Sequence, residues 1–204
     1  MPIQLMIKVT DIETPLKDDD LKNIDISKLK LGKVEYYKPS HSFTHQFGQM
    51  LGLAFKSAAL VAGMKDIAAT TTVESQAQYM MFGGSTVGQI TYGIVVGRDG
   101  ATAESINDYK LGTICPHGTA ANNLSYSNSP FLDPYVVTTT TYLTQNRVVA
   151  NYSAATVTIA EVGIYCLAGT SAHTYCIVRD VLGAPIDIIV GSAKLIQYIF
   201  TSVN

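Results

Sequence analysis

The sequence predicts a mainly β protein, an antiparallel two-sheet sandwich of jelly-roll-like topology with one packed helix and an N-terminal arm. From Pro134 to Asn204, β-branched or aromatic residues recur at every second position, a spacing typical of half-buried strands. A hydrophobic content of 47% in 204 residues is enough to fill a sizeable core between two sheets. We interpret three short pieces of this region as breaks between strands: Gln145-Asn146, Ala168-Gly169 and Gly183-Ala184-Pro185.

The composition changes near Pro39 and divides the chain into two segments. Residues 1–39 are predicted to be an N-terminal arm or strand extension, and residues 40–204 the β-sandwich domain. The first segment has an alternating run, IQLMIKVT, then a polar connection around Asp18-Asp19-Asp20 and a second short strand in GKVEYY. We expect this segment to add a strand to the sheet of a neighbouring subunit. The alternative is that Ile3 to Val9 is an internal strand of its own domain.

One helix is predicted over about residues 41–64. Pro39 and Ser40 supply a start signal, and Gly63 supplies a stop signal. Its apolar stripe is expected to pack on the chain's own sheet, with pairing between subunits as the alternative. Gly48 and Gly52 lie one turn apart, which suggests that another backbone approaches closely there. The stripe consists of Phe43, Phe47, Met50, Ala54 and Val61.

Turn residues are frequent in the next part of the chain, from Ala69 to Asn128. Gln78 to Phe82 and Gln89 to Gly97 are candidate strands, and Ala103 to Leu111 is expected to make one or two helical turns. Gly112 to Ser129 is expected to be a long surface connection.

Charged residues make up only 15% of the chain, against about 25% in typical soluble domains. A surface of hydroxyls and amides suits a protein that packs among copies of itself or other subunits. The net charge of −2 without a basic run argues against nucleic acid as a partner, and no apolar run approaches the ~20 residues of a membrane span. The start MPIQLMIKVTD does not resemble a signal peptide, so we expect the protein to be made in a cytoplasm.

No residue is predicted to be catalytic, to bind a cofactor or to hold a metal, and the chain is not expected to be an enzyme. His41 and His45 have the i, i+4 spacing of two metal ligands on a helix, but a third ligand is missing locally. Cys115 and His117 lie in one turn, where neighbouring side chains rarely point at each other, and Ser85 in FGGST lacks the G-x-S-x-G pattern of a nucleophile.

The remaining cysteines and two charged residues are expected to be structural. Cys166 and Cys176, like Cys115, are expected to be buried free thiols, although those two flank a hairpin and facing each other across it is the alternative. Glu161 and Arg179 stand in apolar strands that we expect to pair, which predicts an ion pair between them.

Several motifs occur in a recurrent order along the chain. GIVVG, DYKL and the His-Gly of CPHG follow the predicted helix, and AEVGIY then precedes CIVRDVLGAPIDIIVGSAKLIQYIF. This series resembles the tailed-bacteriophage virion structural proteins, most of which are uncharacterised, and the resemblance covers Gly32 to the end of the chain. It implies a non-enzymatic virion component, either capsid decoration (cement) or a neck, tail or baseplate subunit. It further implies a homo-oligomer in the virion, assembled in the host cytoplasm, with copies of itself and other virion proteins as partners, and with no assigned catalytic residues.

Two other functions are kept as alternatives. One is a receptor- or carbohydrate-binding module of a phage tail fibre, in which tyrosines such as Tyr126 or Tyr135 would stack on sugars. The chain has 12 tyrosines but no tryptophan, the usual sugar platform, which makes this alternative weaker. The other is a hydrolase, which would require a pocket with a paired nucleophile and base.

Overall fold

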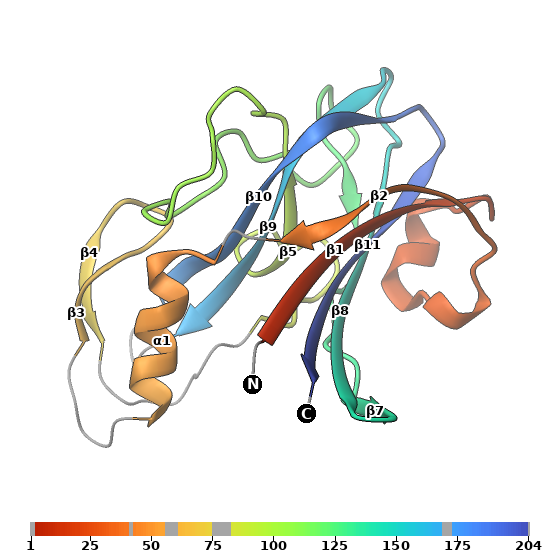
Figure 1. The fold of residues 1–204 in the computed structure, drawn as a ribbon. Helices are drawn as coiled ribbons and strands as arrows, with labels where there is room; N and C mark the ends of the chain where they lie inside the picture. The colour runs from red at the N-terminus through yellow and green to blue at the C-terminus, as the bar shows by residue number, and fades with distance from the viewer. Residues whose placement is uncertain (1–2, 41–42, 56–60, 75–82, 169–172, 204) are drawn as a thin grey trace.

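The computed structural model describes residues 3–40, 43–55, 61–74, 83–168 and 173–203. Antiparallel sheets pack against each other, and one α-helix lies at one end of the packed sheets (Figure 1). The predicted fold class, mainly β and sandwich-like, is therefore confirmed.

The first sheet joins the two ends of the chain. Its strand order is β2-β1-β11-β8-β6, and the short strand β7 also pairs with β8. Residues of β1 pair one to one with residues of β11 along the whole length of β1. The strands are β1 (Ile3–Ile12), β2 (Leu31–Ser40), β6 (Ser125–Tyr126), β7 (Tyr135–Val137), β8 (Thr140–Ala150) and β11 (Ala193–Val203).

The second sheet has the order β10-β9-β5. The helix α1 lies against one end of β10, next to a separate two-stranded hairpin of β3 and β4. These elements are β5 (Gly93–Gly97), β9 (Val157–Ala168), β10 (His173–Ile188), α1 (His45–Phe55), β3 (Val61–Lys65) and β4 (Thr71–Glu74).

The main core fills the space between the two sheets. Ile7 and Val9 of β1 and Ile196 of β11 belong to the same buried cluster as Ile164 of β9 and Val178 of β10. Successive residues of a strand point to opposite faces, so the alternate residues of β8 and β11 face outward.

Two short 3-10 helices cover part of that outer face. They are η1 (Asp18–Asn23) and η2 (Ile26–Lys28), and Leu21 of η1 packs against Val148 and Leu195 in a second buried cluster. The covered part is the end of the sheet where β8 finishes and β11 begins.

The N-terminal arm predicted over residues 1–39 is corrected by this topology. β1 lies between β2 and β11 in the chain's own sheet, so the segment is a strand extension of the sandwich and does not reach outward. Burial gives the reason, because Leu5, Ile7 and Val9 alternate into the main core. The alternative of an internal strand was the right one.

The helix is shorter than predicted. It begins at His45, where the N–H of Thr44 donates to the Ile177 carbonyl and the Thr44 hydroxyl donates to the Cys176 carbonyl, which fixes this end on β10. It extends to Phe55, and the chain around Gly63 forms β3, with Gly63 in a left-handed conformation (φ 79°) beside a register shift. His41 lies outside the described residues, as do the side chains of Ala54 and Val61.

The apolar stripe packs inside the chain, as expected. Met50 is buried in the main core, and half-buried Phe43 and Phe47 pack against it with their rings stacked at 4.2 Å. The close approach inferred at Gly48 is wrong, because Gly48 is exposed and no atom lies within 4 Å of the point a Cβ would occupy. The surroundings of Gly52 lie outside what the structure describes.

Two of the three predicted breaks lie inside strands. Gln145-Asn146 is in the middle of β8, where the Gln145 amide donates to the Gly83 carbonyl (2.6 Å) and Asn146 accepts from Gln197 (2.9 Å). These tertiary hydrogen bonds outweigh the low strand propensity of amide side chains. Gly183-Ala184-Pro185 belongs to β10, within a register shift between Val181 and Ile186 that is typical of a bulge. The strand β9 does end at Ala168.

The middle of the chain also differs from the expectation. Ala103 to Leu111 contains turns and no helix, and the predicted strand over Gln89 to Gly97 begins only at Gly93. The connection from Gly112 to Ser129 is not confined to the surface, since its residues from Leu124 to Ser127 are fully buried. The predicted strand over Gln78 to Phe82 lies outside the described residues.

Candidate functional site

Among the described residues, those considered for chemistry do not come together; His41 is outside that part of the chain. Ser85 is buried and exchanges backbone hydrogen bonds with Ser129, and His45 is exposed at the start of α1. Within the described ranges, no three His, Cys, Asp or Glu side chains lie close enough to hold a metal ion.

Cys115 and His117 have separate structural surroundings. Burial raises the pKa of the Cys115 thiol to about 12, which keeps it neutral and a poor nucleophile at physiological pH. The Nδ1 atom of His117 accepts a hydrogen bond from the backbone N–H of Tyr126 at 3.3 Å. All three cysteines are buried free thiols, as expected.

The predicted ion pair between Glu161 and Arg179 is present and is part of a larger network. Arg179 Nε donates to Glu161 Oε2 at 2.9 Å, and Arg179 Nη1 donates to Asp108 Oδ2 at 2.8 Å. The side chains of Arg179 and Glu161 are 2% and 0% exposed. Burial alone would lower the pKa of Arg179, but hydrogen bonds and charge from Asp108 and Glu161 outweigh burial and raise it.

Backbone N–H and carbonyl groups also take part in this network. Glu161 accepts from the N–H groups of Gly112 and Thr113 at 3.1 and 3.0 Å. Arg179 also donates to the carbonyls of Thr102 and Ala103. With its polar atoms bound in this way, the network fixes loops to strands and leaves little capacity for a substrate.

The motifs quoted for the phage resemblance meet around this network. Asp108 and Leu111 come from DYKL, Glu161 and Gly163 from AEVG, and Arg179 from the Arg-Asp strand. A Cβ on Gly163 would lie 2.5 Å from Leu111 Cδ1 and 2.7 Å from the Val178 carbonyl oxygen. The motifs therefore describe a close-packed scaffold, not a reactive centre.

A second buried arginine was missed by the sequence analysis. Arg147 of β8 is fully buried and donates to the carbonyls of Ile94, Ser127 and Gln89 at 2.6, 3.0 and 2.5 Å. It also lies over the Tyr126 ring, 4.7 Å from the centroid, and burial lowers its pKa to about 10. The signal available in the sequence was Arg147 itself, a charged residue next to Val148 and Val149 in β8. Its acceptors are backbone carbonyls, which every residue type carries, so the sequence does not identify them.

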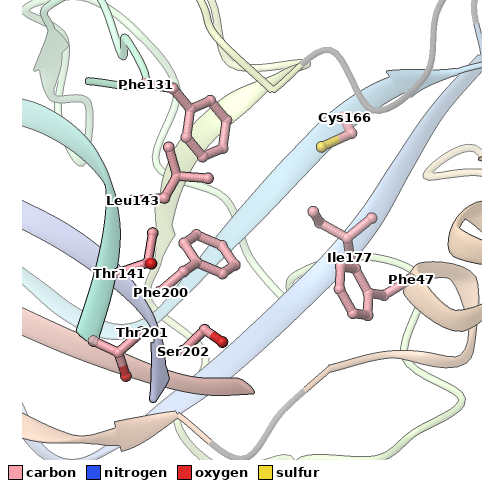
Figure 2. Close-up of a pocket in the computed structure, with 9 residues that line it drawn as sticks. All are labelled: Phe47, Phe131, Thr141, Leu143, Cys166, Ile177, Phe200, Thr201 and Ser202. Atoms are coloured by element: carbon pink, nitrogen blue, oxygen red, sulfur yellow. The ribbon is translucent and has the colours of Figure 1, made fainter. Parts of the chain in front are cut away.

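One pocket opens at the end of the sandwich where β8 begins and β11 ends (Figure 2). It has a volume of about 270 Å³, just below the ~300–1,000 Å³ of pockets for drug-sized ligands. Residues of both sheets and of α1 form its wall, and all of them are uncharged. They are Phe47, Phe131, Thr141, Leu143, Cys166, Ile177, Phe200, Thr201 and Ser202.

The hairpin of β7 and β8 continues the wall of this pocket. Val136 is the cross-strand partner of Thr141, and Thr141 is the partner of Ser202, so the three side chains share one face of the sheet. Leu143 and Phe200, another partnered pair, lie on that face too. A strip of apolar and hydroxyl side chains therefore runs from inside the pocket to the tip of the hairpin.

The hairpin is exposed, apolar and locally strained. Tyr135, Val136 and Val137 are 50%, 66% and 52% exposed, and residues 134–146 contain no charged side chain. Thr138, in the two-residue turn, has φ 53°, a conformation that suits Gly or Asn and costs a β-branched residue about 1–3 kcal/mol. We refer to the pocket and this hairpin together as the uncharged end.

The edge strand β2 also carries exposed apolar residues, including Leu31, Val34 and Tyr37. Its pairing with β1 is interrupted by two register shifts, and it carries Lys38 followed by Pro39. Bulges, lysine and proline are the usual devices that prevent an edge strand from pairing with another chain. The uncharged end places its exposed apolar residues beside an open apolar pocket, which makes it the better candidate for a contact.

The structure gives the two tyrosines considered for sugar binding different roles. Tyr126 is fully buried and its hydroxyl donates to the Cys115 carbonyl at 2.7 Å, so it cannot serve as a sugar platform. Tyr135 is half-exposed and stacks on Tyr142 with a centroid distance of 5.1 Å.

No helix in the part of the chain that the structure describes is long and apolar enough to cross a membrane. The candidate site is thus the uncharged end, which offers an apolar pocket beside an exposed hairpin. Comparison of the chain with family models, with curated proteins and with solved structures finds no match.

Proposed function

We propose that this chain is a non-enzymatic structural component of a tailed-phage virion that acts through subunit contacts. It would decorate the capsid or belong to the neck, tail or baseplate, with copies of itself and other virion proteins as partners. The observation that carries the proposal is the uncharged end, where the Val136 hairpin exposes apolar side chains next to an open apolar pocket. Such a surface favours burial against another protein, because covering it removes apolar area from water and desolvates no charge.

The motif network supports a structural role in a second way. The residues that carry the phage resemblance, among them Glu161 and Arg179, form hydrogen bonds that hold loops and strands together. This is what a rigid building block requires, since a subunit in a particle has to present its contact surfaces in fixed positions. The low fraction of charged residues, 15%, also suits a surface that is covered by neighbours.

The proposal is tested on purified particles of a phage that encodes this chain. Mass spectrometry of virions banded in a density gradient should detect the protein at a copy number that matches a virion symmetry. The same measurement on the unassembled fraction of the lysate is the control. A protein that is abundant in the lysate but missing from the virions would reject the proposal.

A tail-fibre module that binds carbohydrate is the second candidate function. The stacked pair of Tyr135 and Tyr142 is the observation that favours it, because an exposed tyrosine ring can pack on the apolar face of a sugar. Binding on a glycan array that is lost in Tyr135→Ala and kept in Tyr37→Ala would support this function. Tyr37 is a matched control, since it is 58% exposed on β2.

A further inference from the structure

The pocket and the hairpin of the uncharged end have complementary chemistry. The pocket is a cavity lined by apolar side chains, and the hairpin is a projection that exposes Val136 close to its turn. In Figure 1, β7, the last residues of β11 and α1 all lie at the same end of the sandwich. A projection and a hole on one surface allow copies of the same chain to fill each other's pockets.

We propose that the β7–β8 hairpin of one copy of this chain inserts Val136 into the apolar pocket of another copy. The inference deepens the proposed function, on which it rests for its setting in a virion, and it names the surface and the partner. The pocket volume of about 270 Å³ fits one or two apolar side chains better than a larger ligand.

The absence of charge selects a second copy as the occupant. The nine lining residues are uncharged, and so are residues 134–146 and 195–204, which contribute the hairpin and the end of β11. Two identical surfaces that carried charge would repel each other or bury unpaired ions on contact. Neither cost arises for these residues, which lie between Asp133 and Arg147 in the hairpin and after Lys194 in β11.

The backbone at the tip supplies an independent observation. A two-residue hairpin turn normally uses Asn-Gly or a related pair, whereas this chain has Thr138 and Thr139, with Thr138 in a left-handed conformation. A conformation that costs stability at an exposed position points to a role for the tip outside the folding of its own domain. Threonine methyl groups also extend the apolar surface that Val136 presents.

The experiment measures self-association of the full chain by sedimentation equilibrium. Val136→Asp would place a carboxylate in the partner's pocket and should weaken association about a hundredfold or more. Ile189→Asp is the matched control, because Ile189 is 61% exposed in the turn at the far end of β10. It should associate like the natural chain, and both variants should keep the natural melting temperature.

A pocket-filling variant tests the other half of the contact. Ser202→Trp, on β11 and outside the hairpin, should fill the pocket from within and abolish association, as judged on protein that melts like the natural chain. A mixture of the Val136→Asp and Ser202→Trp proteins should associate again, because the first keeps an open pocket and the second keeps an intact hairpin.

The outcomes separate this inference from the proposed function. A natural chain that stays monomeric at all concentrations, or association that survives Val136→Asp, would overturn the hairpin contact. A mixture that fails to associate would overturn it as well. The presence of the protein in virions does not depend on any of these results. The mass spectrometry of purified virions alone tests the structural role.

Discussion

Replacing Arg179 with methionine removes the centre of the buried network while keeping a long apolar stem in its place. The side chain loses its hydrogen bonds to Glu161, Asp108 and two backbone carbonyls. Glu161 would remain buried with a full negative charge and only the N–H groups of Gly112 and Thr113 as donors.

The expected loss of stability follows from burial. Removing one partner of a buried ion pair costs about 3–5 kcal/mol, because the other charge is left uncompensated. The carbonyls released at Thr102 and Ala103 belong to exposed residues and can bind water, so they add little. For a domain of this size, about 2–4 °C per kcal/mol gives a drop in melting temperature of about 6–20 °C.

Urea unfolding of the natural chain and of Arg179→Met measures the difference. Lys22→Met is the control, because Lys22 and Asp19 form an ion pair with side chains 63% and 86% exposed, and such exposed pairs contribute little to stability. The double variant with Glu161→Gln removes the orphaned charge and should be about 2 kcal/mol more stable than the sum of the single effects predicts. Additive effects, or a cost for Arg179→Met below about 1 kcal/mol, would refute the reasoning.

Three further predictions concern packing and titration. Met50→Ala should cost about 2–5 kcal/mol in unfolding free energy, because Met50 is 3% exposed. Phe47 is only half-buried, so Phe47→Ala should cost less than the ~3–5 kcal/mol of a fully buried phenylalanine, and a cost in that range in urea unfolding would contradict this. Gly163→Ala should destabilise the fold, because the new Cβ would press on the Val178 carbonyl. Gly48→Ala, in open space on α1, should stabilise the fold by up to about 1 kcal/mol. A Gly163→Ala protein that melts at a higher temperature than the Gly48→Ala protein would refute this prediction. Burial raises the pKa of Cys166 to about 12, so the folded state holds a proton that the unfolded state releases near pH 9, and stability should fall as the pH rises from about 9 toward 12. Substituting Cys166→Ala should flatten that slope in unfolding measured at several alkaline pH values, and an unchanged slope would count against it.

The strands of the last third could be predicted because a simple physical rule sets their pattern. Alternate residues of β9 and β10 face the core, so apolar side chains recur at period two, and the Glu161–Arg179 pair followed from two charges in strands expected to be neighbours. The boundaries of the strands were harder to predict. Gln145 looks like a strand breaker in sequence, yet its amide is bound to a carbonyl more than 60 residues away.

The arm and the candidate site show what a single sequence cannot supply. An alternating strand has the same pattern whether it pairs with its own sheet or with that of a neighbour, and only the observed pairing of β1 with β11 decides between the two. The pocket depends on the volume left between β8, β11, β9, β10 and α1, a quantity that no local pattern encodes. The exposed YVVTTTTYL hairpin was visible as strand-forming sequence, but its place beside the pocket was not.

A cryo-EM map of the intact virion, at a resolution that shows side chains, tests the central claim most directly. The account predicts that the β-sandwich is found in the particle with its uncharged end buried, and that Val136 of one copy contacts Leu143 or Phe200 of another. A particle without this chain would contradict the structural role. A particle in which the β7–β8 hairpin of every copy faces solvent would contradict the proposed contact between copies.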